Sequence, residues 1–174
     1  INPALVDSVN KYLSKLQIGF NLVFKSIKPS EDFFQIFLKD IKNKFEVNLI
    51  DTGQGLHVSL IPLITHCLAS RHKIIVFEEP EQNLHPSLEA SLADLLVESY
   101  KKRQNQFVIE THSEHLVIGL LKQIKDKTIT NEQVSINFAE IKSGETIIKE
   151  IPIDKSGNLK EWPEGFLPDT LDII

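Results

Sequence analysis

The feature that most constrains this chain is the segment from Ile74 to Pro80, where four apolar residues run directly into two carboxylates and a proline. An uninterrupted apolar run of this kind is typical of a strand that is buried on both faces of a parallel sheet. Pro80 has no N–H to donate to a neighbouring strand, so the strand is predicted to end before it. Glu78 and Glu79 are therefore expected at the carboxyl end of a central strand, where open α/β sheets bind ligands.

Adjacent strand residues point to opposite faces, so one of these two carboxylates can hold a metal ion while the other reaches a water molecule. The alternative is that both glutamates simply end the strand in solvent. A second apolar run, from Phe107 to Ile109, is followed by Glu110, Thr111 and His112. Two predicted strands that end in carboxylates and a histidine favour a functional site at this edge of the sheet.

These two segments resemble the motifs of a known enzyme family. Phe77 to Pro86 resembles the Walker B motif and D-loop of ATP-binding-cassette (ABC-type) ATPases, and Thr111 to Leu116 resembles their switch segment. The most similar branch is the prokaryotic AAA-type ATPases related to the overcoming-lysogenization-defect and chromosome-maintenance ATPases. The resemblance implies an α/β fold of the P-loop NTPase class, ATP and Mg2+ as cofactors, and a homodimer that sandwiches the nucleotide.

The resemblance also implies a role for each motif residue. Glu79 is expected to polarise the attacking water, and His112 is expected to contact the γ-phosphate. Glu78 is expected to hold Mg2+, directly or through water, although most cassettes have Asp at this position. The D-loop falls on four consecutive residues: Asn83, Leu84, His85 and Pro86. A zinc site is the alternative for His112 and His115, but this pair supplies fewer ligands than zinc requires.

A glycine-containing turn precedes a predicted helix from Leu56 to Ser70. Two glycines at this position allow backbone N–H groups to approach an anion at the helix N-terminus, although a plain turn explains them equally well. The turn resembles the signature segment of the same ATPase branch. That resemblance assigns five residues to the ATP of a partner protomer: Asp51, Thr52, Gly53, Gln54 and Gly55.

The signature segment departs from the family pattern after Gly55. The residues from His57 to Ser59 replace the expected Ser-Gln pair, and Pro62 is displaced by about one position, so the two glycines carry the assignment. Pro62 also predicts a kink or a late start in the helix.

The sequence contains no Gly-x-x-x-x-Gly-Lys-[Ser/Thr] phosphate loop. In the ATPase family this loop precedes all the motifs described above. Because the chain begins at Ile1 and contains no Met, we expect it to be the C-terminal part of an ATPase whose phosphate loop lies upstream. We expect this part alone to hydrolyse no ATP and to bind it weakly.

Composition limits the choice of partners and compartment. With 41% hydrophobic and 25% charged residues, the 174-residue chain has a typical soluble composition. A net charge of −5 does not favour a broad nucleic-acid surface, so DNA binding stays open but unsupported. A single cysteine, Cys67, permits no internal disulfide and fits a cytoplasmic protein. No apolar run is long enough to predict a membrane span.

The apolar spacing predicts three parts along the chain. They are a helix with three antiparallel strands in residues 1–50, the signature, Walker B and switch core in residues 51–140, and a hairpin with a C-terminal tail in residues 141–174. The predicted fold class is therefore an ABC-ATPase-like α/β lobe with parallel core strands, a small antiparallel region before them and a β-hairpin after them.

Two other functions stay open. One is a non-catalytic, degenerate cassette that acts as an interaction module, which the altered residues after Gly55 favour and the intact Glu79 and His112 oppose. The other is an ATPase linked to a nuclease in phage defence. Too few residues follow His112 for a nuclease domain within this chain, so the nuclease would be a separately encoded partner, by analogy with the family alone.

Overall fold

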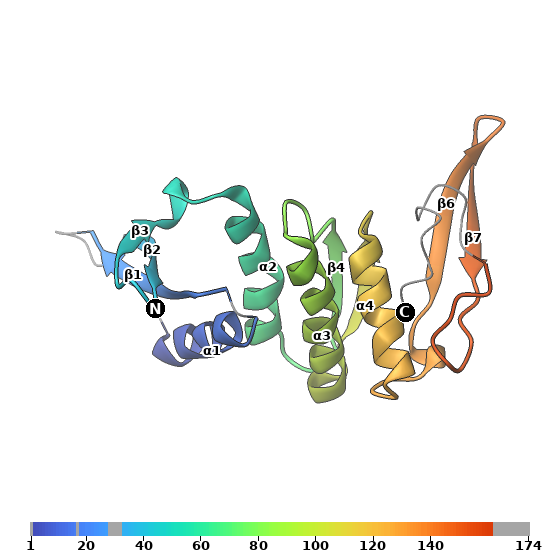
Figure 1. Ribbon diagram of the computed structural model, residues 1–174, viewed down its shortest axis with the longest axis horizontal. Coiled ribbons are helices and arrows are strands. Elements are labelled where there is room, and N and C mark those ends of the chain that lie inside the picture. Colours follow the sequence, from blue (N-terminus) through green and yellow to red (C-terminus); the bar gives the residue numbers. More distant parts are fainter. Residues whose placement is uncertain (1, 17, 28–32, 162–174) are drawn as a thin grey trace.

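The computed structural model describes residues 2–16, 18–27 and 33–161. Within these residues the chain forms a three-stranded antiparallel sheet, a two-stranded parallel sheet with helices packed against it, and a two-stranded hairpin. These parts follow one another along the long axis of the molecule (Figure 1). The arrangement confirms the predicted α/β class. Residues 28–32 and the predicted C-terminal tail from residue 162 onward lie outside the described residues.

The N-terminal part is the predicted helix and antiparallel sheet. Its elements are α1 (Pro3–Lys15), β1 (Phe20–Ser26), β2 (Phe34–Asp40) and β3 (Glu46–Asn48). The Asn2 side chain caps α1 by accepting a hydrogen bond from the Ala4 N–H at 3.0 Å. Leu22 and Leu38 are paired across β1 and β2 and are buried in one core with Leu13 of α1. Burial of this apolar face is what fixes the helix against the sheet.

Helix α2 (Gln54–Leu68) follows a short 3-10 helix, Leu49–Asp51. The helix begins two residues earlier than predicted, so the late start, one of the two effects predicted for Pro62, is wrong. Gly53 serves as the N-terminal cap, and Gly55 lies in the first helical turn. Pro62 lies inside the helix and is buried, although it cannot donate the usual helical hydrogen bond.

The parallel strands are joined by a helical crossover. Its elements are β4 (Ile74–Glu78), α3 (Pro86–Arg103) and β5 (Gln106–Glu110), and α4 (Glu114–Lys125) comes next. In the register of the two strands, Val76 pairs with Val108 and Glu78 pairs with Glu110. The predicted parallel pair is confirmed, and the two strands end together at one edge of the sheet.

Within the described residues, only one face of the parallel sheet is covered. Phe77 and Phe107 point into the core, where their rings stack with centroids 6.3 Å apart. On the other face Ile74, Val76 and Val108 are 70%, 67% and 53% exposed. The prediction that β4 is buried on both faces is therefore wrong for the described chain, because its helices pack on one face alone.

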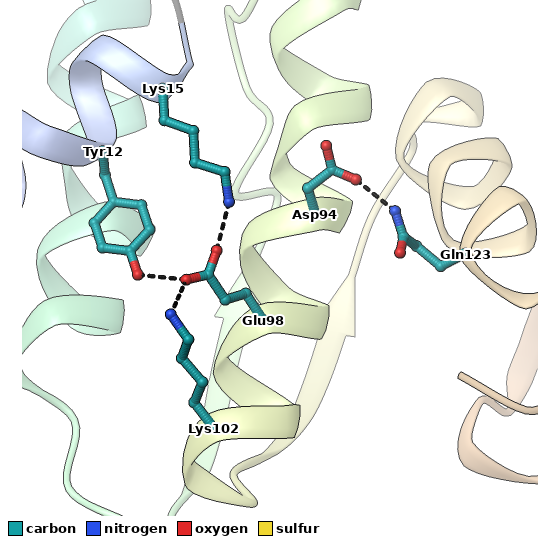
Figure 2. Close-up of polar contacts among 6 residues, drawn as sticks. All are labelled: Tyr12, Lys15, Asp94, Glu98, Lys102 and Gln123. Carbon is teal, nitrogen blue, oxygen red and sulfur yellow. Dashed lines mark hydrogen bonds and ion pairs between the residues drawn. The ribbon is translucent and has the colours of Figure 1, made fainter. Parts of the chain in front are cut away.

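Helix α3 is tied to the helices on either side of it (Figure 2). Glu98 accepts hydrogen bonds from the Tyr12 hydroxyl at 2.6 Å, from Lys15 at 2.6 Å and from Lys102 at 2.5 Å. Burial opposes ionisation of Glu98, but these three donors outweigh it and lower the pKa of the carboxyl to about 2. The ionised Glu98 therefore joins α1 to α3, while Gln123 of α4 donates to Asp94 of α3 at 2.5 Å.

The C-terminal part is a hairpin formed by β6 (Ile136–Lys142) and β7 (Glu145–Ile151). Most of β6 lies before residue 141, where the hairpin part was predicted to begin. Ser143 and Gly144 form its turn with φ of 53° and 84°, the left-handed conformation that a tight hairpin turn requires. The hairpin extends away from the helices (Figure 1), while its base packs on Leu121 and Ile124 of α4. No helix in the described part of the chain is long and apolar enough to cross a membrane.

Candidate functional site

Glu79 lies at a sharp turn directly after β4. Its φ of 41° is in the left-handed region, which is costly for a residue with a side chain. The Glu79 N–H donates to the Glu110 carbonyl at 2.9 Å, and the Glu79 carbonyl accepts from the Gln82 N–H at 3.0 Å. The first bond extends the pairing with β5 and the second closes the turn, so together they hold the strained residue in place.

The Glu79 carboxylate faces His112, as the sequence predicted for residues that end neighbouring parallel strands. His112 Nε2 lies 3.6 Å from Glu79 Oε1, and Gln82 Nε2 donates to Glu79 Oε2 at 3.1 Å. The His112 side chain is 79% exposed, and the Glu79 side chain is 40% exposed. A carboxylate and an imidazole that are close together and open to solvent can both contact a ligand at this edge of the sheet.

Glu78 lies at the end of β4, on the face of the sheet that points away from the core. It is the last residue of β4 and pairs in register with Glu110, so these two exposed carboxylates stand side by side. Carboxylate oxygens are suitable ligands for Mg2+, which usually completes its shell with phosphate and water oxygens. No group of three or more His, Cys, Asp or Glu side chains that could hold a metal ion occurs among the described residues.

The loop that carries His112 is held by the residues that follow it. The Ser113 hydroxyl accepts from the Leu116 N–H at 2.9 Å and so caps α4. The same hydroxyl donates to Glu89 in the first turn of α3. This connection fixes the start of α4 beside the start of α3, and the sequence predicted neither partner.

The two glycines of the signature-like turn have different surroundings. A Cβ atom at Gly55 would lie 2.4 Å from the Asn83 carbonyl oxygen, so the turn packs directly on the predicted D-loop of the same chain. A Cβ atom at Gly53 would meet no atom within 4 Å. Asp51 and Gln54 are also exposed. The open side of this turn is therefore formed by Asp51, Gly53 and Gln54.

Other polar side chains of this turn are used within it. The Thr52 hydroxyl donates to the Leu49 carbonyl at 2.7 Å, and His57 Nε2 contacts the same carbonyl oxygen. The Ser59 hydroxyl is buried and donates to the Leu56 carbonyl at 2.9 Å. These three side chains stabilise the helix start, and this local role was not visible in the sequence.

The four predicted D-loop residues link the Glu79 turn to α3. Asn83 has a φ of 60°, and the Leu84 N–H donates to the Glu81 carbonyl at 2.9 Å. His85 caps α3 by accepting from the Ser87 N–H at 3.3 Å, and Pro86 is the first helical residue. Proline is favoured at this position, since its missing N–H has no partner there in any case.

Several solved structures share this fold. A structure from work on ATP-driven dimerization and DNA-stimulated activation of SMC ATPases matches with a TM-score of 0.64 at 15% identity, over 86% of this chain and 84% of that one. An Smc head bound to the C-winged helix domain of ScpA matches with a TM-score of 0.64 at 16% identity, over 88% and 44%. The Smc head domain from Pyrococcus yayanosii matches with a TM-score of 0.64 at 16% identity, over 88% and 28%.

At this level of identity these structures establish the fold alone, which is that of SMC ATPase head domains. The chain spans less than half the length of the last two. Residues 2–117 match the AAA ATPase domain family, and the chain belongs to that family. Residues 129–172 match a second family, a protein of unknown function designated DUF3696. No curated protein is significantly similar to the chain.

Proposed function

We propose that this ATPase domain supplies the water-activating carboxylate and the γ-phosphate contact of an ATP-hydrolysing site, with Glu79 and His112 in these roles. The observation that carries the proposal is their approach to 3.6 Å at the common edge of β4 and β5. Glu79 orients and polarises the attacking water, and His112 stabilises charge that develops on the γ-phosphate. Positioning and charge stabilisation of this kind account for most of the catalysis of phosphoryl transfer.

Glu78 would hold Mg2+, directly or through water. The neighbouring Glu110 supports this assignment, because two adjacent carboxylates on the open face offer several oxygen ligands. When bound, the ion would neutralise charge on the β- and γ-phosphates. The phosphates themselves need a backbone cradle, which would come from a phosphate loop in residues outside this sequence.

The turn from Asp51 to Gly55 would contact the nucleotide of a second copy of the protein. The exposed side of the turn at Gly53 supports this role, since it leaves the N-terminus of α2 accessible to an anion. An interface of this kind is two-fold symmetric and forms two equivalent sites. One related ATPase structure comes from work on ATP-driven dimerization.

A substitution at Glu79 tests the proposal in the complete ATPase. Glu79→Gln should abolish hydrolysis while ATP stays bound, because glutamine keeps the shape but loses the carboxylate. His112→Ala should lower kcat about a hundredfold, as expected for one lost transition-state contact. Steady-state hydrolysis and nucleotide binding measure the two effects. If both variants hydrolyse ATP at the wild-type rate, the two residues are not catalytic.

A non-catalytic interaction module is the second candidate. It is favoured by the local hydrogen bonds of Thr52 and Ser59, which occupy hydroxyls that could otherwise contact phosphate. In that case ATP binding would control association with a partner, such as a separately encoded effector. Wild-type protein that binds ATP, dimerises and shows no hydrolysis would support this candidate over the first.

A further inference from the structure

The buried carboxylate of Glu81 has no role in the site described so far. Glu81 is 7% exposed, although it lies only two residues after Glu79 on the turn that leaves β4. Burial of an ionisable side chain is costly unless its charge is compensated by hydrogen bonds. The hydrogen-bond partners of Glu81 therefore indicate which part of the structure the buried carboxylate stabilises.

Among the described residues, Glu81 accepts two hydrogen bonds, and both come from the segment after β5. The Thr111 hydroxyl donates to Glu81 Oε1 at 2.5 Å, and the backbone N–H of His112 donates to the same oxygen at 3.0 Å. One carboxylate oxygen thus joins the turn after β4 to the loop after β5. Glu81 Oε2 is buried and has no hydrogen-bond partner among the described residues.

This contact continues through the loop into the helices. Thr111 Oγ1 also accepts from the Ser113 N–H at 3.0 Å, and Ser113 caps α4. Glu81 therefore fixes the backbone directly before and at His112, while the His112 ring remains exposed and points toward Glu79. A buried side chain that restrains the backbone of an exposed one is suited to positioning it.

We propose that Glu81 is a positioning residue, whose carboxylate holds the His112 segment at the distance from Glu79 that the site requires. This inference rests on the proposed ATPase function. It adds to that site a residue to which the sequence motifs assigned no role. Glu81 contacts neither nucleotide nor water in this role and acts through His112. A misplacement of His112 by about 1 Å would be enough to lower the rate strongly.

Glu81→Ala in the complete ATPase tests the proposal. Loss of the acceptor should lower kcat about tenfold or more, with KM for ATP and nucleotide affinity within about twofold of wild type. Glu81→Gln should restore most of kcat, because its amide oxygen accepts the same two hydrogen bonds. Glu132→Ala is the matched control, since Glu132 is an exposed carboxylate on the short helix before β6, and its kcat should equal that of wild type.

A double-mutant cycle with His112→Ala separates positioning from a general structural role. If Glu81 acts through His112, then Glu81→Ala should cause no further loss of kcat in the His112→Ala background. Losses that multiply, or a wild-type kcat in Glu81→Ala alone, overturn the proposal. If Glu81→Ala fails to fold, Thr111→Val replaces it in the cycle, because it removes one of the two hydrogen-bond donors to Glu81. Thr111→Val should likewise cause no further loss of kcat in the His112→Ala background.

The cycle also distinguishes failure of the inference from failure of the proposed function. If Glu79→Gln and His112→Ala both hydrolyse ATP at the wild-type rate, the proposed function is wrong, and the positioning role of Glu81 is then wrong as well. If those two variants lose activity while Glu81→Ala does not, only the positioning role is overturned.

Discussion

Gly53 and Gly55 are two residues apart, yet the structure requires glycine at only one of them. A side chain at Gly55 would collide with the Asn83 carbonyl oxygen, whereas a side chain at Gly53 would extend into open space. The φ of Gly53 is −64°, which any residue can adopt. Gly55 therefore has a structural role within its own chain, and Gly53 is the position that can report on contacts with a second chain.

Gly55→Ala is predicted to lower the free energy of unfolding by about 1–3 kcal/mol, the usual cost of adding a methyl group to a packed contact. Gly53→Asn should cause no loss, because asparagine is a preferred N-terminal cap for a helix. Urea unfolding of the two variants measures both effects. Equal losses in the two variants would show that the Gly55 contact with the D-loop does not limit stability.

At the scale of single residues, the sequence predicted the site in part. The pairing of Glu79 with His112 was predictable, since residues that end neighbouring parallel strands must meet at one edge. The bonds from Glu81 to Thr111 and from Gln82 to Glu79 were not. They depend on how two turns pack together, and no periodicity in the sequence encodes that contact.

At the scale of elements, most helices and strands follow from the spacing of apolar residues, including α1, α3 and α4. Helix α2 begins earlier than predicted. The prediction placed Gly53 and Gly55 in a turn, because two glycines close together in a sequence usually indicate one. The contact of Gly55 with Asn83 favours glycine in the first helical turn instead. The apolar run in β4 likewise indicated that both faces of the strand could be buried. It did not indicate that the helices of the described chain cover only one of those faces.

The packing of α1 on α2 includes a buried histidine with a predictable effect on stability. His66 is 3% exposed, its ring meets that of Tyr12 edge-on at 4.5 Å, and neither ring nitrogen has a hydrogen-bond partner among the described residues. Burial, with a smaller contribution from Arg103, lowers the pKa of His66 from 6.5 to about 4. The imidazole is therefore neutral in the folded protein at neutral pH.

The unfolded chain takes up a proton at His66 near pH 6.5, whereas the folded chain does so only near pH 4. Between these values the unfolded state binds more protons, so the free energy of unfolding should fall as the pH falls, by at most about 3 kcal/mol. His66→Phe should flatten this part of the pH profile in chemical denaturation. His115→Gln, at an exposed histidine, should leave it unchanged, and an identical slope in His66→Phe would contradict the assignment.

At the scale of the whole molecule, the parallel sheet is the least complete part of the described chain. It has two strands, and Ile74, Val76 and Val108 form a continuous exposed apolar surface on its open face. Apolar surface of this kind is usually covered in a folded protein. The open face beside Glu78 and Glu110 is therefore the part of the described chain where further packing is expected.

Under the proposed function, one copy supplies Glu79 and the other supplies the Gly53 turn of each ATP site. Gly53→Asp suits the test because aspartate caps a helix well, so folding is preserved, but its charge repels phosphate. Gly53→Asn is the uncharged control. Two linked heterodimers are compared. In the split form, one copy carries Glu79→Gln and the other carries Gly53→Asp. In the joint form, one copy carries both changes and its partner is wild type.

ATP hydrolysis by these two heterodimers is the most direct measurement. If the sites are shared between copies, the split form keeps one intact site and should show about half of the wild-type rate for independent sites. The joint form should then be inactive, because each of its two sites contains one altered residue. The opposite result, with an active joint form and an inactive split form, would show that Glu79 and the Gly53 turn act in the same copy and would contradict the proposed two-copy ATP site.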